Sequence, residues 1–271
     1  MTRESPPAAG PPASAAGLRL ADVWLARHGL DDARPTPLLA ARLVARERAR
    51  LAAAVIPCAL ILASALAAVS AFGGARSHGP LPLLALASLV AGLLLAQSLL
   101  DWWVRRVDRR AGAALSRRAA HPIQPGWRAV LGRPYAVFAV AAFAGAMTLA
   151  GSALAVPDPT ARQVAVVVLI GLLGVTALNA MQLRHLLRRP VVAEDEESLA
   201  ADVIMRVEDA RDLTTPNVQV ILPMVLLFGT APGWWGAAAV AYLVLSLGAS
   251  VALRIRTPSC ATVARRAMIV R

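Results

Sequence analysis

Six apolar segments run along this chain of 271 residues, and each is close to the length that a membrane demands. A helix needs about 20 mainly apolar residues to cross a hydrocarbon core of ~30 Å. The segments are 51–72, 81–103, 134–156, 163–183, 216–232 and 236–253. Only 16% of the residues are charged, against roughly 25% in soluble domains. The pattern predicts an all-α fold, a polytopic membrane helical bundle with six transmembrane helices and cytoplasmic helical extensions.

Arginine is distributed unevenly about these segments. Of the 28 arginines, 26 lie before the first segment, in every second loop or after the last segment, and only Arg76 and Arg162 lie in the remaining loops. Loops that stay in the cytoplasm retain positive charge. We therefore expect a multi-pass protein of the inner (plasma) membrane with both termini in the cytoplasm. Retention beside anionic lipid accounts for the net charge of +12, so the lipid bilayer, and no nucleic acid, is the expected partner.

The segments divide the chain into three parts. Residues 1–36 form an N-terminal part that starts with a disordered tract rich in Pro, Ala, Ser and Gly, followed by a short helix at 21–28. This helix can lie in the membrane interface or pack on the cytoplasmic loops. Residues 37–253 form the transmembrane domain, whose first helix begins at Pro37 because Thr36 is a good N-cap. Residues 254–271 form a cytoplasmic tail.

An acidic, amphipathic helix is predicted at 196–213, in the loop between the fourth and fifth segments. Eight acidic residues lie at 191–215, and such a charge disfavours anionic lipid. Leu199, Val203 and Val207 recur at helical spacing and form its candidate docking stripe. The opposing surface is either a partner protein or the basic extension of the second segment, and a solvated helix without a dock is the alternative. That extension carries Arg105, Arg106, Arg109 and Arg110.

Four polar residues form a candidate intramembrane cluster near the cytoplasmic rim. Gln97 and Asp101 are one turn apart in the second segment, and Asn179 and Gln182 are one turn apart in the fourth. An apolar medium makes unpaired polar groups costly, so these side chains should face protein rather than lipid. A polar vestibule that contacts substrate is one interpretation. Hydrogen bonding between helices is the other, and the lack of charge on three of the four residues favours it.

The remaining chemistry-bearing residues form no recognisable site. The four histidines are scattered among loops and rims, without a partner at metal-ligand spacing. No serine has a base at recognisable spacing. No Lys, Arg, Glu or His lies at mid-depth in a segment, which disfavours a proton-coupled carrier. We therefore expect no catalytic residue, no cofactor and no metal, and hence no enzyme.

Two resemblances bear on function. The tract from Arg188 to Asp202, followed by the acidic helix to Arg211, resembles a segment of uncharacterised six-span integral membrane proteins of high-GC bacteria, which often accompany transport ATPases. More loosely, an interfacial helix, six spans and a long loop between spans two and three are similar to the permeases of ABC-2 type transporters. The short 232–235 link departs from that family, which usually has re-entrant helices there.

These resemblances imply a membrane component of a transport system coupled to a cytoplasmic ATPase, or to a regulatory protein, and they allow a homo-oligomer. The alternative from a different class is a non-transporting membrane scaffold that presents its charged helices to a partner. A transporter should contain a polar or water-filled path between its helices, whereas a scaffold should be packed solid with small residues.

Overall fold

A computed structural model of the chain describes residues 14–72, 81–113, 126–189, 196–214 and 234–269. These residues are helical apart from short connections, and no strand occurs among them. The elements are α1 (Ala15–Arg27), α2 (Pro37–Phe72), α3 (Leu81–Ala113), α4 (Trp127–Val130), α5 (Arg133–Ser152), the 3₁₀ turn η1 (Ala153–Ala155), α6 (Pro159–Arg188), α7 (Glu196–Thr214), α9 (Trp234–Arg256) and α10 (Cys260–Ile269).

Four helices of the described chain are long and apolar enough to cross a membrane. They span Leu86–Ala111 in α3, Arg133–Ala155 across α5 and η1, Pro159–Arg188 in α6, and Trp234–Arg256 in α9. They coincide with the second, third, fourth and sixth segments of the sequence and indicate a membrane protein. The first segment forms the second half of α2, where many side chains lie outside the described residues, and the fifth segment lies wholly outside them.

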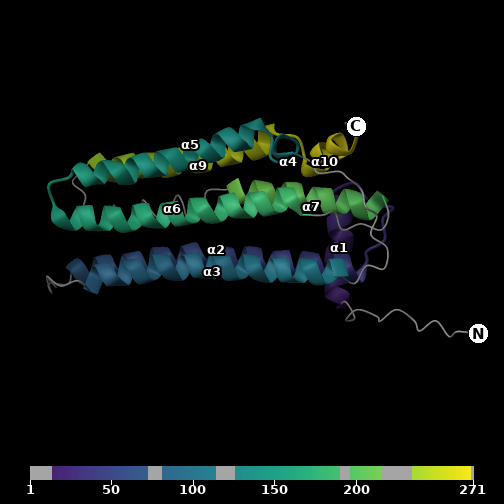
Figure 1. Cartoon of the computed structure of the whole chain (residues 1–271), viewed down its shortest axis with the longest axis horizontal. Helices are drawn as coiled ribbons and strands as arrows, with labels where there is room; N and C mark the ends of the chain where they lie inside the picture. The colour runs from purple at the N-terminus through teal and green to yellow at the C-terminus, as the bar shows by residue number, and fades with distance from the viewer. Residues whose placement is uncertain (1–13, 73–80, 114–125, 190–195, 215–233, 270–271) are drawn as a thin grey trace, which may run out of the picture.

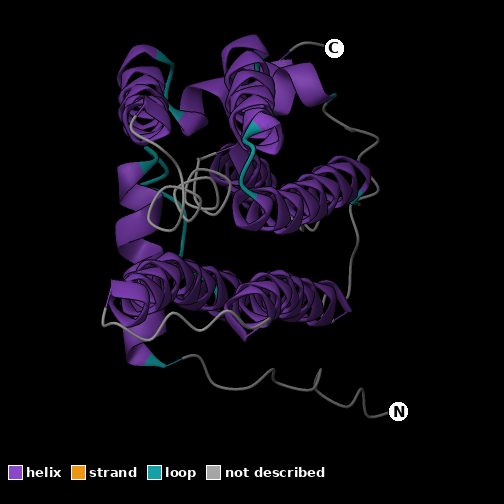
Figure 2. Cartoon of the chain, turned by 90° about the vertical axis from the view of Figure 1, so that its left-hand side faces the viewer, coloured by secondary structure: helices purple, strands orange, loops and turns teal. Residues whose placement is uncertain are grey.

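The long helices form three layers (Figure 1). α2 packs on α3 in one outer layer and α5 packs on α9 in the other, while α6 and α7 lie between them. α1 runs across one end of the bundle, and α10 lies at the same end (Figure 1). Viewed end-on, α1 extends from the α2–α3 layer toward the α5–α9 layer (Figure 2). The bundle therefore has a capped end, where α1, α7 and α10 meet, and an end without this cap.

Small residues bring the apolar helices close together. Ala146 and Ala150 of α5 and Ala165 of α6 are fully buried in one hydrophobic cluster. A Cβ placed on Gly145 would lie 2.9 Å from the ring of Tyr242, whose hydroxyl donates to the carbonyl of Ala142 at 2.6 Å. The absence of a side chain at Gly145 thus permits the close contact between α5 and α9.

The outer faces of these helices remain apolar. Val140 is 70% exposed on α5, Leu245 is 72% exposed on α9, and Leu95 on α3 is similarly open. Soluble monomers rarely expose contiguous apolar surfaces of this kind. The exposed residues lie on helices that are long enough to span a bilayer, so acyl chains are their natural neighbours.

The N-terminal helix differs from its prediction. It begins at Ala15 rather than near residue 21, because the Ser14 hydroxyl accepts from the Gly17 amide at 3.1 Å and caps it. Part of the tract that we expected to be disordered is therefore helical, and residues 1–13 lie outside the described residues. Trp24 and Leu25 are buried against α2, α7 and α10, so this helix packs on its own chain.

The predicted helix starts at Pro37 and Glu196 agree with the structure. The Thr36 hydroxyl accepts from the Leu39 amide at 3.2 Å, as an N-cap does. The tail contains a helix, α10, that was not predicted from the sequence. This helix starts at Cys260 because the preceding Ser259 side chain accepts from the Thr262 amide at 3.3 Å.

Candidate functional site

Two buried arginines on the first half of α2 organise the capped end. Arg42 and Arg46 are each 5% exposed. Arg42 donates through Nε to Asp108 of α3 at 2.9 Å and through Nη2 to Asp202 of α7 at 2.5 Å. Arg46 donates to Asp108 at 3.0 Å and to Asp209 of α7 at 3.0 Å. These bonds tie α2 to α3 and α7 through groups that are costly to bury unless they are paired.

Asp202 is the most deeply buried acid of the network, with no exposed surface. Besides Arg42, it accepts from Nε of Arg206, one turn further along α7, at 3.0 Å. Burial alone would raise the pKa of Asp202, but Arg42 and Arg206 outweigh burial and lower it. Arg189, just after α6, pairs with Asp108 and so joins α6 to the same network. Asp202 is therefore charged at neutral pH and accepts hydrogen bonds from both Arg42 and Arg206.

The edge of the network reaches α1. Glu208 of α7 lies 3.1 Å from Nε2 of His28 and accepts from the indole of Trp24 at 3.3 Å. Burial opposes charge on His28, but its bonds to Glu208 and to the Trp24 carbonyl raise its pKa above the usual value. Arg50 of α2 pairs with Asp212 at 2.9 Å in a more exposed position. The network thus connects α1, α2, α3, α6 and α7 and ends at the surface.

The acidic helix α7 packs on its own chain. Leu199, Val203 and Val207, the predicted docking stripe, are at most 9% exposed. Leu199 and Val203 pack with residues of α1, α2 and α10, whereas Val207 packs against α4 and α5. Since these side chains are already covered, the stripe does not form a free surface for another protein.

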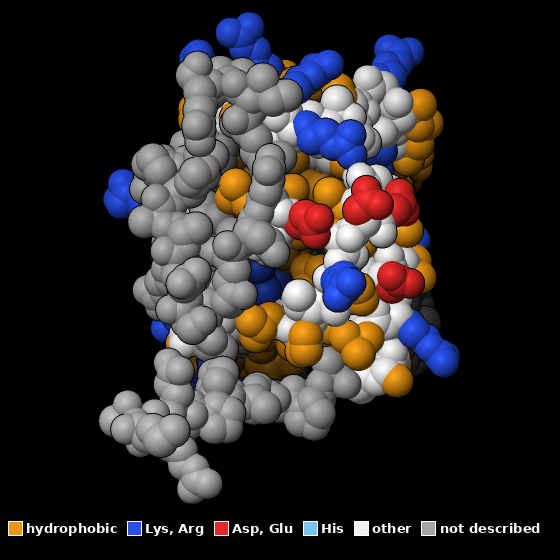
Figure 3. Space-filling view, turned by 90° about the vertical axis from the view of Figure 1, so that its right-hand side faces the viewer, with side chains coloured by type: hydrophobic (Ala, Val, Ile, Leu, Met, Phe, Trp, Pro, Cys, Tyr) orange, Lys and Arg blue, Asp and Glu red, His pale blue; other side chains and the backbone are white. Residues whose placement is uncertain are grey.

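The arginines opposite α7 are not the ones that the sequence analysis proposed. Among the described residues, Arg105, Arg106, Arg109 and Arg110 form no ion pair with α7, and the last three are exposed. Arg106 instead lies over the ring of Trp102 at 4.9 Å. The rotation of α3 about its axis accounts for this: Asp108 faces Arg42 and Arg46 of α2, whereas Arg106, Arg109 and Arg110 lie on the exposed side of the helix. Figure 3 shows arginine and acidic side chains on the surface at the capped end.

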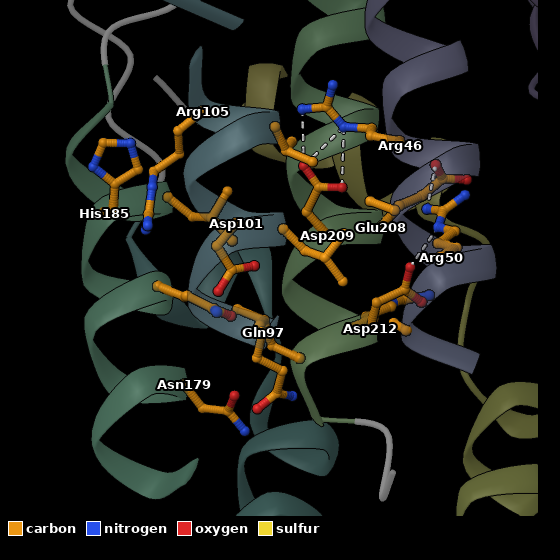
Figure 4. Close-up of a pocket in the computed structure, with 18 of the residues that line it drawn as sticks. Arg46, Arg50, Gln97, Asp101, Arg105, Asn179, His185, Glu208, Asp209 and Asp212 are labelled. Carbon is orange, nitrogen blue, oxygen red and sulfur yellow. Dashed lines mark hydrogen bonds and ion pairs between the residues drawn. The ribbon is translucent and has the colours of Figure 1, made fainter. Parts of the chain in front are cut away.

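A cavity of about 750 Å³ adjoins the network between α2, α3, α6 and α7. The four residues of the predicted polar cluster, Gln97, Asp101, Asn179 and Gln182, all line it. Figure 4 shows Gln97 and Asp101 on α3 beside Asn179 on α6, with Arg46, Asp209 and Arg50 on the other side. α3 and α6 run in the same direction, with Gly174 beside Leu94 and Arg189 paired with Asp108, and this parallel packing brings the cluster together.

The cluster does not hold the two helices together by hydrogen bonds. Within the part of the chain that the structure describes, Gln97, Asp101, Asn179 and Gln182 have no hydrogen bond to one another or to any other side chain. The Oε1 atom of Gln97 is buried and lacks a partner there. These polar groups therefore face the cavity with unused hydrogen-bonding capacity, which interhelical bonding would have consumed.

The network and the cavity provide no visible metal site. No group of three His, Cys, Asp or Glu side chains suited to a metal ion occurs among the described residues. Cys260 lines the cavity, and burial raises the pKa of its thiol. A thiol with a raised pKa is mostly protonated and is a poor nucleophile.

The pairing of Arg42 and Arg46 with Asp108 was not predicted from the sequence. A signal was present, because Arg42, Arg46 and Arg50 recur every fourth residue on one face of α2, and Asp202 and Asp209 are seven residues apart on one face of α7. Two faces of matching period and opposite charge can pair along their length.

No protein-family model, curated protein or solved structure matches this chain.

Proposed function

We propose that the chain is the membrane component of a transport system and that the cavity beside α3 and α6 is its ligand chamber. The observation that carries the proposal is the set of unpartnered polar groups facing that cavity from two helices of membrane-spanning length. The cavity volume lies within the ~300–1,000 Å³ of small-molecule sites. The proposal assigns no catalysis, metal or cofactor to the chamber.

The position of the chamber supports a vestibule that opens on one side of the membrane. Gln97 and Asn179 lie toward the ends of α3 and α6 that adjoin the arginine-rich network. In the orientation favoured by the arginine distribution, that end faces the cytoplasm. The chamber then receives or releases ligand on the cytoplasmic side of the inner membrane.

Coupling to a cytoplasmic ATPase remains part of the proposal, but through a different surface from α7. The apolar stripe of α7 is covered by the chain itself, whereas Arg106, Arg109 and Arg110 of α3 are exposed at the same end. An acidic face on an ATPase or a regulatory protein would complement these arginines. Such a contact would be steered by charge and weakened by salt.

A membrane scaffold is the second candidate, and one observation favours it. The capped end is densely connected, with α1, α2, α7 and α10 sharing one buried cluster. A chain whose only task is to present a rigid surface would show the same packing. It would have no need for a polar cavity, which is why we place transport first.

Water accessibility of the cavity separates the two functions. The experiment places single cysteines at Gln97 and Asn179 in a chain carrying Cys58→Ser and Cys260→Ser. A charged, membrane-impermeant thiol reagent is then applied to right-side-out and inverted membrane vesicles. We expect both positions to react in inverted vesicles, because the chamber is hydrated from the cytoplasmic side.

Two control positions calibrate the labelling. Val140→Cys on α5 should stay unreactive, since this position is exposed on an apolar outer face. Thr160→Cys, at the exposed start of α6, should react only in right-side-out vesicles. Labelling of Gln97→Cys and Asn179→Cys that is no faster than that of Val140→Cys would show a dry cavity, which would leave the scaffold.

A further inference from the structure

The acidic residues that line the cavity fall into two groups. Asp108 and Asp209 pair with Arg46, while Asp212 and Glu208 lie within 3.5 Å of Arg50. Asp101 is different. Among the described residues, no arginine or histidine nitrogen lies within 4 Å of its carboxylate, although Arg105 is one turn away. The other carboxylates are therefore paired with arginines of the protein, whereas the carboxyl group of Asp101 has no ion pair among the described residues.

Three amide side chains line the cavity near Asp101. Gln97 lies one turn earlier on α3, and its buried Oε1 has no partner among the described residues. Asn179 and Gln182 face the same space from α6 and add two amide oxygens. A buried acceptor without a partner costs about 1–3 kcal/mol. This corner of the cavity thus presents one carboxylate and three amide groups, and the nearest arginine, Arg105, lies one turn along α3.

We propose that this corner binds the ammonium group of a small primary amine that is the ligand of the chamber. An ammonium group carries three N–H donors and no acceptor, which complements one carboxylate and the nearby amide oxygens. Hydrogen bonds between charged groups are the strongest of this kind and gain strength where water is scarce. This inference rests on the proposed function, because it names the ligand class of the same chamber.

The rest of the lining limits the ligand to a single positive charge. Arg105 follows Asp101 on α3, and Arg189 and Arg46 line the same cavity. A second ammonium group, as in a diamine, would meet these arginines and be repelled. A carboxylate placed in the corner would meet Asp101. The chamber should therefore prefer a monoamine over a diamine, and both over an acid of equal length.

The experiment compares four-carbon probes that differ in their charged groups. Purified protein in detergent is titrated with n-butylammonium, putrescine, 1-butanol and butyrate, and binding is followed by ligand-observed NMR. We expect saturable binding of n-butylammonium that is at least ~10-fold tighter than that of the other three probes. Equal binding of n-butylammonium and 1-butanol would overturn the proposal, because burial of the alkyl chain alone would then explain the signal.

Three variants connect the binding to named groups. Asp101→Asn should weaken n-butylammonium binding at least ~10-fold while keeping the side-chain shape. Gln97→Leu removes the unpartnered acceptor, so it should weaken binding and raise the unfolding temperature together, which a purely structural role of Gln97 would not produce. Glu47→Gln, an exposed acid on α2, is the matched control and should change nothing. Unaltered binding in both Asp101→Asn and Gln97→Leu would sink the inference.

Failure of the inference can be told apart from failure of the proposed function. If Gln97→Cys and Asn179→Cys react with the thiol reagent but n-butylammonium shows no preference, the chamber stands and its ligand class is wrong. If these positions do not react, both proposals fall.

Discussion

The capped end and the apolar half of the bundle hold their helices together by opposite means. At the capped end, Arg42, Arg46 and Asp202 are buried as charges, and each has at least two partners. In the apolar half, fully buried alanines such as Ala146 and Ala165 bring helices close without polar bonds. Ion pairs fix one relative position of two helices, whereas small-residue packing tolerates sliding more readily.

The cavity lies where the two kinds of packing meet. Asp108 on α3 belongs to the network, and Asp101, two turns earlier on the same helix, does not. Gly174 of α6, further from the network, approaches Leu94 of α3 closely enough that an added Cβ would lie 2.8 Å from its side chain. Between these regions, α3 and α6 meet through neither charges nor close packing, and a polar space remains. The cavity therefore lies at the boundary between two regions that are packed by different means.

The first test of this comparison removes one buried charge from the network at the capped end. Arg46→Gln should lower the free energy of unfolding by about 3–5 kcal/mol, because Asp108 and Asp209 lose a shared buried partner. The measurement is unfolding by titration with sodium dodecyl sulfate in mixed micelles, followed by circular dichroism. The matched control is Arg109→Gln on α3, which removes an exposed arginine and should change stability by less than ~0.5 kcal/mol. Similar losses in both variants would contradict the assignment of Arg46 to the network.

The second test overpacks the apolar region. Gly145→Ala should lower stability by about 1–3 kcal/mol, because the new methyl group would meet the ring of Tyr242 at 2.9 Å. Gly151→Ala, on the same helix, is the control. Its Cβ would meet nothing within 4 Å, so this variant should be neutral or slightly stabilising. The same unfolding titration serves, and a Gly145→Ala variant as stable as Gly151→Ala would show that α5 and α9 are not closely packed.

The third and smallest effect concerns the edge of the charged region. Because the folded-state pKa of His28 is raised, its pair with Glu208 stabilises the fold fully below the unfolded value of about 6.5. This contribution is lost as the pH rises through the folded-state pKa. The difference in stability between the wild-type chain and His28→Gln should therefore shrink from pH 5.5 to pH 8.5. It should stay below ~1 kcal/mol, since the pair is partly open to solvent. If the stability difference between the wild-type chain and His28→Gln grew with pH instead, the pair with Glu208 would not depend on a protonated His28, and the raised pKa would be contradicted.

The elements set by local pattern were predictable from the sequence. Apolar runs located α3, α5, α6 and α9, and the pair Thr36 and Pro37 located the start of α2. The six-span arrangement stays a prediction, since the segment at 216–232 lies outside the described residues. The N-cap Ser14 and the N-cap Ser259 were overlooked, although each carries the ordinary signal of a helix start.

The pairing between distant helices was not predictable in the same way. The stripe of Leu199 and Val203 indicated a buried face, but the pattern did not tell which surface covers it. The choice between Arg46 and Arg109 as a partner of α7 depends on how α2 and α3 are rotated about their axes. That rotation is set by the packing of the whole bundle. The polar cluster was grouped by depth along the segments, and its four residues line one cavity, whereas its lack of hydrogen bonds required the separation of α3 and α6 to be known.

The network also has a consequence for the order in which the protein is made. Arg42 precedes its partner Asp202 by 160 residues, and Asp108 precedes Asp202 as well. At a synthesis rate of ~5–20 residues per second, the wait is on the order of ten to thirty seconds. Between the synthesis of Asp108 and that of α7, Arg42 and Arg46 have only the carboxylate of Asp108 to share among the partners they have in the finished network. A chain that stops before α7 keeps this excess of positive charge. Burial of Arg42 and Arg46 is therefore more costly in the unfinished chain than in the complete protein, where Asp202 and Asp209 pair with them.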